Sequence, residues 1–303
     1  MNKIIRGIFY GNIFLGVCAV ALCIETNLLT NISLNVFPFY LVIFFCTCIY
    51  YTMIYVRSVG AKNYNERTLW YRNNLPEIKR TLKIALFVVI TFLLFLLFKN
   101  IHTFFLLTLS QCLLIILLPL IAGWYTFSPR VFRLKKIRQT GWIKPFVVGL
   151  TWSGWVTVYP ILISKVQTNQ LDIYVISSYL LLALQNFLFF TVVAIIFDVK
   201  DYRTDFNHQL KTFPVILGVR KTFRFIITPL TFLNLVIFFI FQRQAKFSAG
   251  QTILQLIPYF LLILILVKHR QQKSLFYYLV AVDGLLFAKA LCGITSILLL
   301  KNN

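Results

Sequence analysis

Residues 197–218 read FDVKDYRTDFNHQLKTFPVILG and directly follow a long apolar run. The chain has 303 residues and only eight acidic ones, and three of these lie here: Asp198, Asp201 and Asp205. If the preceding helix continues, the three positions are spaced i, i+3 and i+7 and fall within about 60° of one another around its axis. Carboxylates gathered on one face repel each other, so the pattern predicts a cation between them.

Magnesium with a bound phosphate suits such a position. Mg²⁺ prefers carboxylate oxygens and commonly completes its shell with water and substrate phosphates. Nearby basic side chains could hold phosphate oxygens directly: Lys200, Arg203, Lys211, Arg220 and Lys221. The alternative is a solvated helix end whose mixed charges pair with one another at i,i+3 and i,i+4. The spacing alone leaves both interpretations open.

Composition places this stretch in a membrane protein. The chain is 59% hydrophobic and 13% charged, and a soluble domain of this size has too little polar surface to cover so much apolar surface. Apolar runs near the length of a membrane-spanning helix recur throughout. We therefore expect an all-α, polytopic membrane protein, with one domain over 1–303 and about nine transmembrane helices in one bundle. The predicted helices cover 9–24, 36–55, 84–98, 104–124, 146–163, 173–197, 225–241, 253–267 and 275–300.

The distribution of basic residues predicts the orientation of the bundle. With these nine helices, 24 of the 30 Lys and Arg residues fall on one side of the membrane, together with the N-terminus and the three aspartates. The positive-inside rule assigns that side to the cytoplasm. The net charge of +22 is then explained by topology and anionic lipid, which argues against a nucleic-acid partner. The segment that begins with Lys3 and Arg6 is expected to be a retained helix, not a cleaved signal peptide.

The 198–218 stretch resembles the second aspartate-rich motif of the UbiA-type prenyltransferase superfamily. That motif has an Asn or Asp, then Asp-x-x-x-Asp, a Gly, a basic residue, Thr-Leu-Pro and a further Gly. The matching positions are Asp198, Asp201, Asp205, Lys211, Thr212, Phe213, Pro214 and Gly218. Gln209 stands where the family usually has Gly, which adopts positive φ freely. The basic "RLK" at 133–135, before the fifth predicted helix, also resembles the family.

The resemblance implies a nine-helix enzyme that joins a polyprenyl diphosphate to an acceptor, for which an aromatic, quinone-type molecule is one candidate. It implies Mg²⁺ on Asp198, Asp201 and Asp205, with Lys211 completing the catalytic set. Arg57, Arg203, Tyr50 and Tyr51 are expected to contact substrate. Tyr50, Tyr51, Trp152 and Trp155 are candidates for the wall of the prenyl cavity, or alternatively residues of packing and interfacial belts. The implied location is a bacterial-type plasma membrane, with the site loops cytoplasmic; no protein partner can be inferred.

One part of the family pattern is missing. Active members carry a first motif, Asn-Asp-x-x-Asp-x-x-x-Asp, at the end of the second helix. The matching stretch here, 46–70, reads CTCIYYTMIYVRSVGAKNYNERTLW and contains no aspartate; its one acid is Glu66. Two other functions therefore stay open: a catalytically degenerate relative that binds lipid or has a structural role, and a transporter. The second would be expected to show internal repeats, and none is clear.

Several polar residues fall inside predicted helices. The amides of Gln111, Gln185, Asn186, Asn234 and Gln255 are expected to form hydrogen bonds between helices. Asp283 and Lys289 are costlier to bury, so a functional position is expected for each. Their six-residue separation places them about 120° apart around a helix, which makes them poor partners for each other.

Overall fold

A computed structural model of the chain describes residues 3–60, 66–105, 107–127, 141–168, 176–207, 209–268 and 275–300. Within these ranges the secondary structure is helical, without a strand. The first half contains α1 Lys3–Tyr10, α2 Ile13–Leu29, α3 Phe37–Ser58, α4 Glu66–Asn73, α5 Leu75–Lys99, α6 Ile101–Phe105 and α7 Leu109–Phe127. The next elements are η1 Gly141–Ile143, α9 Lys144–Ser153, η2 Gly154–Val158, α10 Tyr159–Thr168, α11 Ile176–Lys200 and α12 Tyr202–Asn207. The last are α13 Phe213–Leu217, α14 Val219–Thr222, η4 Phe223–Ile227, α15 Thr228–Gln244, α16 Ala249–Lys268, α17 Leu275–Tyr278, η5 Leu279–Asp283 and α18 Gly284–Leu300.

The described residues contain seven helices long and apolar enough to cross a membrane, or eight if α1 and α2, bent by 57°, form one span. The seven are Phe37–Ser58, Leu75–Lys99, Gly141–Val166, Ser177–Lys200, Val219–Gln244, Ala249–Leu266 and Leu279–Leu299. Leu109–Gly123 is a shorter apolar helix. The predicted all-α, polytopic architecture is confirmed, whereas the predicted count of nine spans is not.

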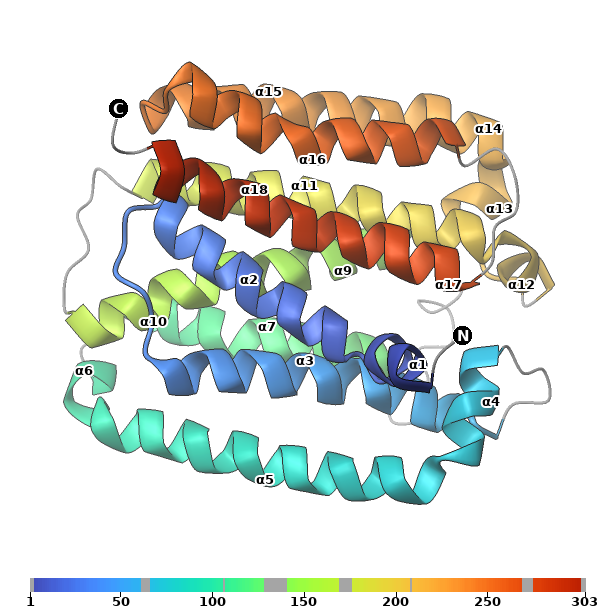
Figure 1. Cartoon of the computed structure of the whole chain (residues 1–303), viewed down its shortest axis with the longest axis horizontal. Helices are drawn as coiled ribbons and strands as arrows, with labels where there is room; N and C mark the ends of the chain where they lie inside the picture. The colour runs from blue at the N-terminus through green and yellow to red at the C-terminus, as the bar shows by residue number, and fades with distance from the viewer. Residues whose placement is uncertain are drawn as a thin grey trace.

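The long helices lie side by side in one bundle (Figure 1). α11 packs against α9 and α15, α18 packs against α2 and α16, and α3 packs against α2 and α5. α11 is the most buried of the seven long apolar helices, because its neighbours cover it on several sides. The bundle therefore places Asp198, in the last turn of α11, and the two aspartates just beyond it at one end of its central helix.

Four predicted boundaries differ from the structure in an informative way. α5 begins at Leu75, nine residues before the predicted start at 84, because Pro76 in its first turn and Glu77 support a polar, helical N-terminus. The predicted 9–24 helix is broken at Asn12, which has a φ of 61°. The predicted 146–163 and 275–300 helices contain the π-helical turns η2 and η5. A hydropathy pattern predicts none of these features, because each depends on local backbone geometry and not on how apolar the residues are.

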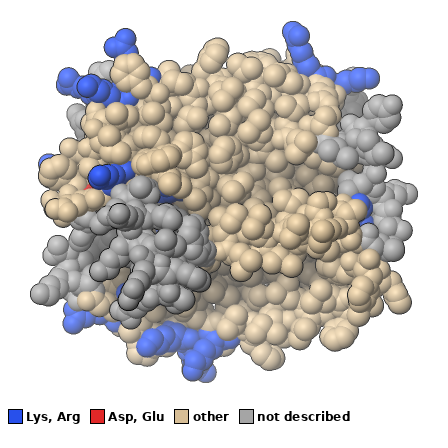
Figure 2. Space-filling view, turned by 180° about the vertical axis from the view of Figure 1, so that it is seen from behind, with Lys and Arg blue, Asp and Glu red and all other residues tan. Residues whose placement is uncertain are grey.

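The outer surface of the bundle is apolar. Large side chains such as Phe87, Phe98, Phe232 and Leu299 are exposed, and Figure 2 shows a broad face with Lys and Arg gathered toward its rim. An exposed apolar band with charges at its edges is what a lipid bilayer requires. The chain is therefore an integral membrane protein.

Candidate functional site

The three aspartates lie where α11 ends and α12 begins. α11 ends at Lys200, Asp201 occupies the turn, and Asp205 lies in α12. Asp198 and Asp205 are buried, with exposed fractions of 0% and 7%, whereas the side chain of Asp201 is 43% exposed. The common face predicted for all three is therefore only partly formed, because the turn at Asp201 separates the two helices. We call Asp198, Asp201 and Asp205 the aspartate cluster, and the end of the bundle that carries it the aspartate end.

Lys144 is the basic partner of this cluster. It is the first residue of α9, and its Nζ donates to Asp198 Oδ1 at 2.5 Å. The charge of Lys144 also acts on Asp205. Burial raises the pKa of Asp205 to about 6, and the charge of Lys144 opposes that shift. The sequence places Lys144 only in a basic loop; its role depends on the packing of α9 against α11.

Two carboxylate oxygens of the cluster have no partner among the described residues. Asp198 Oδ2 and Asp205 Oδ2 are both buried and accept no hydrogen bond there. An unpaired buried acceptor costs free energy, so each is available to a ligand that supplies a donor or a cation. Within the described residues, no three His, Cys, Asp or Glu side chains are arranged to hold a metal ion by themselves.

The loop after α12 has the backbone conformation that the family resemblance leads us to expect at the position of its glycine. Gln209 has a φ of 55°, so the position where the family usually has Gly does take the left-handed conformation. Lys211 follows two residues later and is exposed. A Cβ at Gly141 would lie 2.9 Å from the Thr212 backbone nitrogen, so this glycine lets the loop approach the start of α9. The structure thus brings Lys211 to the aspartate end, and Arg203 is exposed on α12.

A second polar cluster lies beside the end of α3. Arg67 on α4 is 3% exposed. Its Nη2 donates to the Tyr10 carbonyl at 3.0 Å and to Asn12 Oδ1 at 2.5 Å, and its Nη1 donates to Tyr55 OH at 3.1 Å. Its guanidinium carbon also lies 4.0 Å from the Tyr55 ring centroid. This buried cation therefore ties α4 to the end of α3 and to the α1–α2 junction.

Asn12 and Tyr71 complete this Arg67 cluster. Asn12 Nδ2 donates to Thr52 Oγ1 and to Tyr71 OH, both at 3.1 Å, and Tyr71 OH donates to the Tyr10 carbonyl at 2.8 Å. Burial raises the pKa of Tyr71, so the phenol stays neutral. Sequence reasoning missed the cluster, because it counted Arg67 only as a loop charge. Arg57, expected to contact substrate, is exposed at the end of α3.

An aromatic cavity lies inside the bundle, among α3, α7, α9 and η2. Its volume is about 250 Å³. The lining residues are Cys46, Thr47, Tyr50, Tyr51, Leu118, Pro119, Ala122, Gly123, Thr151, Trp152 and Trp155. All four aromatic residues proposed for the cavity wall are among them. Trp152 Nε1 donates to Tyr51 OH at 2.6 Å, and Trp155 Nε1 donates to Thr47 Oγ1 at 3.0 Å, so these rings are held in fixed orientations.

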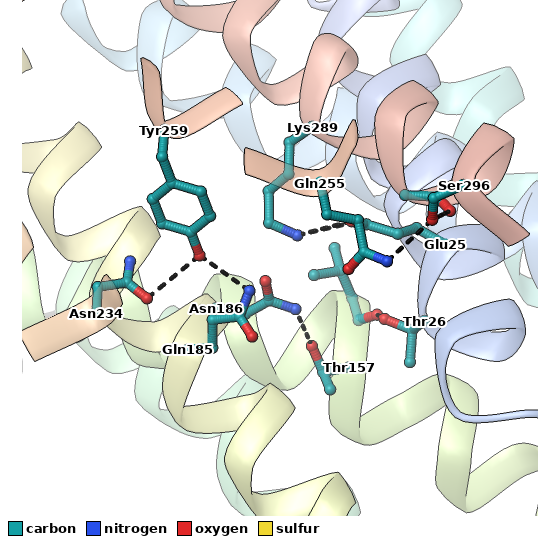
Figure 3. A network of polar contacts seen from close by, with 12 residues as sticks. Glu25, Thr26, Thr157, Gln185, Asn186, Asn234, Gln255, Tyr259, Lys289 and Ser296 are labelled. Carbon is teal, nitrogen blue, oxygen red and sulfur yellow. Dashed lines mark hydrogen bonds and ion pairs between the residues drawn. The ribbon is translucent and has the colours of Figure 1, made fainter. Parts of the chain in front are cut away.

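A third polar cluster lies deeper in the bundle, where side chains of several helices converge (Figure 3). Lys289 on α18 donates to both carboxylate oxygens of Glu25 on α2, at 3.0 and 2.9 Å. Both residues are 4% exposed. Gln185 donates to Tyr259 at 2.9 Å, and Asn186 donates to Thr157 at 2.7 Å. Gln255 donates to Ser296, and Asn234 accepts from Tyr259, so four of the five amides make the predicted hydrogen bonds between helices. Gln111 does not: its Oε1 accepts from the Thr108 backbone nitrogen at the start of its own helix.

Lys289 has the buried, paired position that an intramembrane charge requires, and its partner is Glu25. The expectation that Asp283 would not be that partner is confirmed. A Cβ at Gly293 would come within 2.5 Å of Glu25 Oε1 and Cγ. The glycine, one turn after Lys289, therefore makes the space in which the carboxylate lies.

Comparison with known proteins identifies the fold. No family model and no curated protein matches the sequence. A solved structure of a digeranylgeranylglyceryl phosphate synthase, a UbiA-type prenyltransferase of membranes, is similar over 98% of this chain and 99% of that one. The TM-score is 0.58 and the sequence identity is 15%. The chain therefore has the fold of that membrane enzyme, and the UbiA-type fold expected from the sequence is confirmed.

Proposed function

We propose that this protein transfers a prenyl group from a polyprenyl diphosphate to an acceptor within the membrane. The observation that carries the proposal is the aspartate cluster: buried, partly unpartnered carboxylates lie at the end of the central helix of a prenyltransferase fold. An aromatic cavity within the same bundle supplies an apolar space for the prenyl chain. An aromatic acceptor of the quinone type belongs to the same proposal.

The aspartate cluster fits Mg²⁺ as cofactor. Asp198 Oδ2 and Asp205 Oδ2 are oxygen donors of the kind that Mg²⁺ prefers, and both are without a partner among the described residues. Asp201 lies between them in sequence and reaches solvent, so it could complete the set. Bound Mg²⁺ would neutralise the charge that develops on the departing diphosphate.

Basic side chains at the aspartate end would bind the diphosphate oxygens. Lys144 donates to Asp198 of the aspartate cluster, and Lys211, Arg57 and Arg203 are exposed at the same end. Contacts from Lys or Arg to phosphate are strong, charge-assisted hydrogen bonds. With Asp198, Asp201 and Asp205, these residues form the proposed catalytic and substrate-binding set.

The aromatic cavity would hold the reacting end of the prenyl chain. Ionisation of the allylic C–O bond gives a carbocation, and the faces of aromatic rings attract cations. Trp152, Trp155, Tyr50 and Tyr51 line the cavity, and their bonded orientations fix which ring faces it. The cavity would also keep water away from the cation.

A catalytically degenerate, lipid-binding protein is the second candidate. Two observations favour it: Asp198 is already paired with Lys144, and the stretch 46–70, which matches the first carboxylate motif, contains no aspartate and carries the buried Arg67. Such a protein would keep the aromatic cavity and bind a prenyl lipid without cleaving it.

The proposed orientation places the aspartate end and the N-terminus in the cytoplasm of a bacterial-type cell, with the bundle in the plasma membrane. The excess of Lys and Arg expected on that side supports it. The proposed partners are the bilayer, a polyprenyl diphosphate and its acceptor; nucleic acid is not among them.

Purified protein with a radiolabelled polyprenyl diphosphate tests the function. We expect diphosphate release and adduct formation in Mg²⁺ and neither in EDTA. Asp201→Asn and Asp205→Asn should lower the rate, while Glu77→Gln, the same change at an exposed acid of α5, should not. Tight prenyl binding without cleavage would favour the second candidate, and binding unchanged by the two aspartate variants would exclude the proposed metal site.

A further inference from the structure

Trp155 lies at the inner end of the aromatic cavity, away from the aspartate cluster. α9 starts beside that cluster, because its first residue, Lys144, donates to Asp198 at 2.5 Å, and from there it runs into the bundle (Figure 1). Trp155 follows Lys144 by eleven positions, which at ~1.5 Å per residue is about 16 Å. At this depth Trp155 lines the cavity together with Thr47 of α3 and Leu118 of α7.

A row of side chains crosses the bundle at this end of the cavity. Trp155 Nε1 donates to Thr47 Oγ1 at 3.0 Å. The Trp155 ring packs edge-on against the Tyr159 ring, with centroids 5.2 Å apart, and Tyr159 OH donates to the Ile115 carbonyl at 2.8 Å. That carbonyl needs a donor, since Pro119, four positions later, has no N–H. The row therefore joins α3 to α7 through η2 and α10.

The cavity does not continue beyond this row. Ile43, Ile115 and Tyr159 lie one turn deeper on α3, α7 and α10, and none of them lines the cavity. Leu118 packs directly beside Gly154, where a Cβ would come within 2.6 Å of Leu118 Cδ1. Among the described residues, the inner end of the cavity is therefore closed by tight packing.

The π-helical turn η2 carries Trp155, and α2 holds this turn in place. Thr26 of α2 is buried, and its Oγ1 donates to the Val156 carbonyl at 2.7 Å. The usual helical donor to that carbonyl would be the N–H four positions later, but Pro160 stands there and has none. Single π-helical turns are rare and occur frequently at functional sites. The hydroxyl of Thr26 thus fixes the backbone directly beside Trp155.

The volume of the cavity limits what it can contain. A dry apolar cavity of about 150 Å³ holds one benzene molecule. In the same proportion, a cavity of about 250 Å³ holds about ten carbon atoms, the size of about two prenyl units. A longer chain would meet the closed inner end and would have to displace packed side chains, which is unfavourable.

We propose that Trp155 and Leu118 limit the prenyl chain that this protein binds to about two units, and that Thr26 is the positioning residue that holds Trp155 at the cavity end. The inference rests on the proposed function and narrows its donor to a short-chain prenyl diphosphate. The diphosphate lies at the aspartate cluster, the prenyl units fill the cavity, and the indole of Trp155 contacts the far end of the chain.

Binding of prenyl diphosphates of different length tests the closed end. The probes are radiolabelled geranyl and geranylgeranyl diphosphates, with two and four prenyl units, bound in Mg²⁺ to protein in lipid nanodiscs; excess unlabelled donor gives the background. We expect wild type to bind the geranyl compound about tenfold more tightly or better, because the longer chain over-fills a packed site. Trp155→Ala and, independently, Leu118→Ala open the end and should bring the two dissociation constants within about threefold of each other.

Phe232→Ala is the matched control for these two changes. This ring on α15 is 69% exposed, so its removal should leave the preference for the geranyl compound at the wild-type value. If Trp155→Ala is unstable, Leu118→Ala decides alone, because it opens the same end of the cavity from the other wall.

Thr26→Val tests the positioning role, since it keeps the shape of the side chain and removes the donor to the Val156 carbonyl. The unsatisfied carbonyl should let the turn shift, so that the preference for the geranyl compound weakens about threefold or more while geranyl binding itself stays within about twofold. Thr26→Ser retains the hydroxyl and should retain the preference. A Thr26→Val protein with a lowered melting temperature and the wild-type preference would overturn the positioning role.

Two results would overturn the assignment of the cavity end. Wild type could bind the geranylgeranyl compound as tightly as the geranyl compound, or Leu118→Ala and a folded Trp155→Ala could keep the wild-type preference. A wild type that binds neither donor would instead refute the proposed function, so the two failures are distinguishable.

Discussion

At the scale of single residues, the ion pair between Glu25 and Lys289 shows how strongly a membrane interior couples two side chains. Both residues are 4% exposed, and the lysine donates to both carboxylate oxygens. Removing one partner leaves the other charged and buried, which is far costlier than replacing both by apolar groups.

The first prediction is a double-mutant cycle on this pair. Lys289→Met alone should lower the free energy of unfolding by about 3–5 kcal/mol, because Glu25 is then unpaired. Glu25→Met combined with Lys289→Met should recover most of that loss. Thermal unfolding in detergent measures each variant. Additive effects of the two single changes would show that the pair does not exist in the folded protein.

Gly293 gives a second prediction at the same site. Gly293→Ala should destabilise the protein by about 1–3 kcal/mol, since the new Cβ would overlap Glu25. Gly284→Ala in the same helix is the control: a Cβ there meets nothing within 4 Å, so this change should be neutral or stabilising. Equal melting temperatures for the two variants would contradict the close approach of Glu25 to Gly293.

Asp205 provides a prediction of pH dependence. Its pKa is raised from 3.8 to about 6 in the folded protein, so the fold favours the protonated acid. The stabilisation that the folded state gains from protonated Asp205 is fully present below pH 3.8. It is lost as the pH rises through about 6. In EDTA, Asp205→Asn should therefore gain stability relative to wild type as the pH rises from 4 to 7. A difference in melting temperature that does not vary with pH would rule out the raised pKa.

The sequence could predict which residues belong to one site only where those residues are close together along the chain. Asp198, in the last turn of α11, and Asp205, in the adjoining α12, are seven positions apart and so are close together through the chain itself. The bond from Lys144 to Asp198 joins positions 54 apart, and the Glu25–Lys289 pair joins positions 264 apart. Contacts of that separation depend on helix packing, which one sequence does not reveal.

At the scale of secondary-structure elements, the segment after α11 illustrates how turns set the site. Continuation of the helix would have placed all three aspartates on one face, but the chain turns at Asp201 and starts a new helix. The apolar pattern ends here, so hydrophobic periodicity no longer predicts whether the chain continues as a helix or turns. Turns and π-helical segments are therefore the parts of the fold that the sequence predicts least well.

Gly218 allows a test of this local geometry. It links α13 to α14 with φ 78° and ψ 154°, a region open almost only to glycine, and a Cβ there would meet nothing within 4 Å. Gly218→Ala should therefore cost about 1–3 kcal/mol through backbone strain alone. The melting temperature measures it, and a neutral substitution would mean that the turn readily adopts another conformation.

At the scale of the whole molecule, hydropathy and charge predicted the architecture well, because lipid imposes strong constraints on every long helix. The predicted 36–55, 173–197, 225–241 and 253–267 segments all fall largely within observed apolar helices. The weaker prediction was the exact number of spans: α1 and α2 are bent at Asn12, and the apolar part of α7 is short.

The proposed orientation leads to a labelling prediction. In a variant without the six native cysteines, a single cysteine at Arg203, on the aspartate end, should resist a membrane-impermeant thiol reagent in intact cells and react after lysis. A cysteine at Lys246, in the connection between α15 and α16 at the other end, should react in intact cells. The reverse pattern would place the aspartate cluster outside the cytoplasm.

The link between α2 and α18 also has a consequence for biosynthesis. Glu25 lies on α2, which is synthesised well before α18, and its partner Lys289 follows 264 positions later. During synthesis α2 therefore carries a buried acid whose partner does not yet exist, until α18 inserts. Until then the acid must be protonated or hydrated, because an unpaired carboxylate is costly in the bilayer.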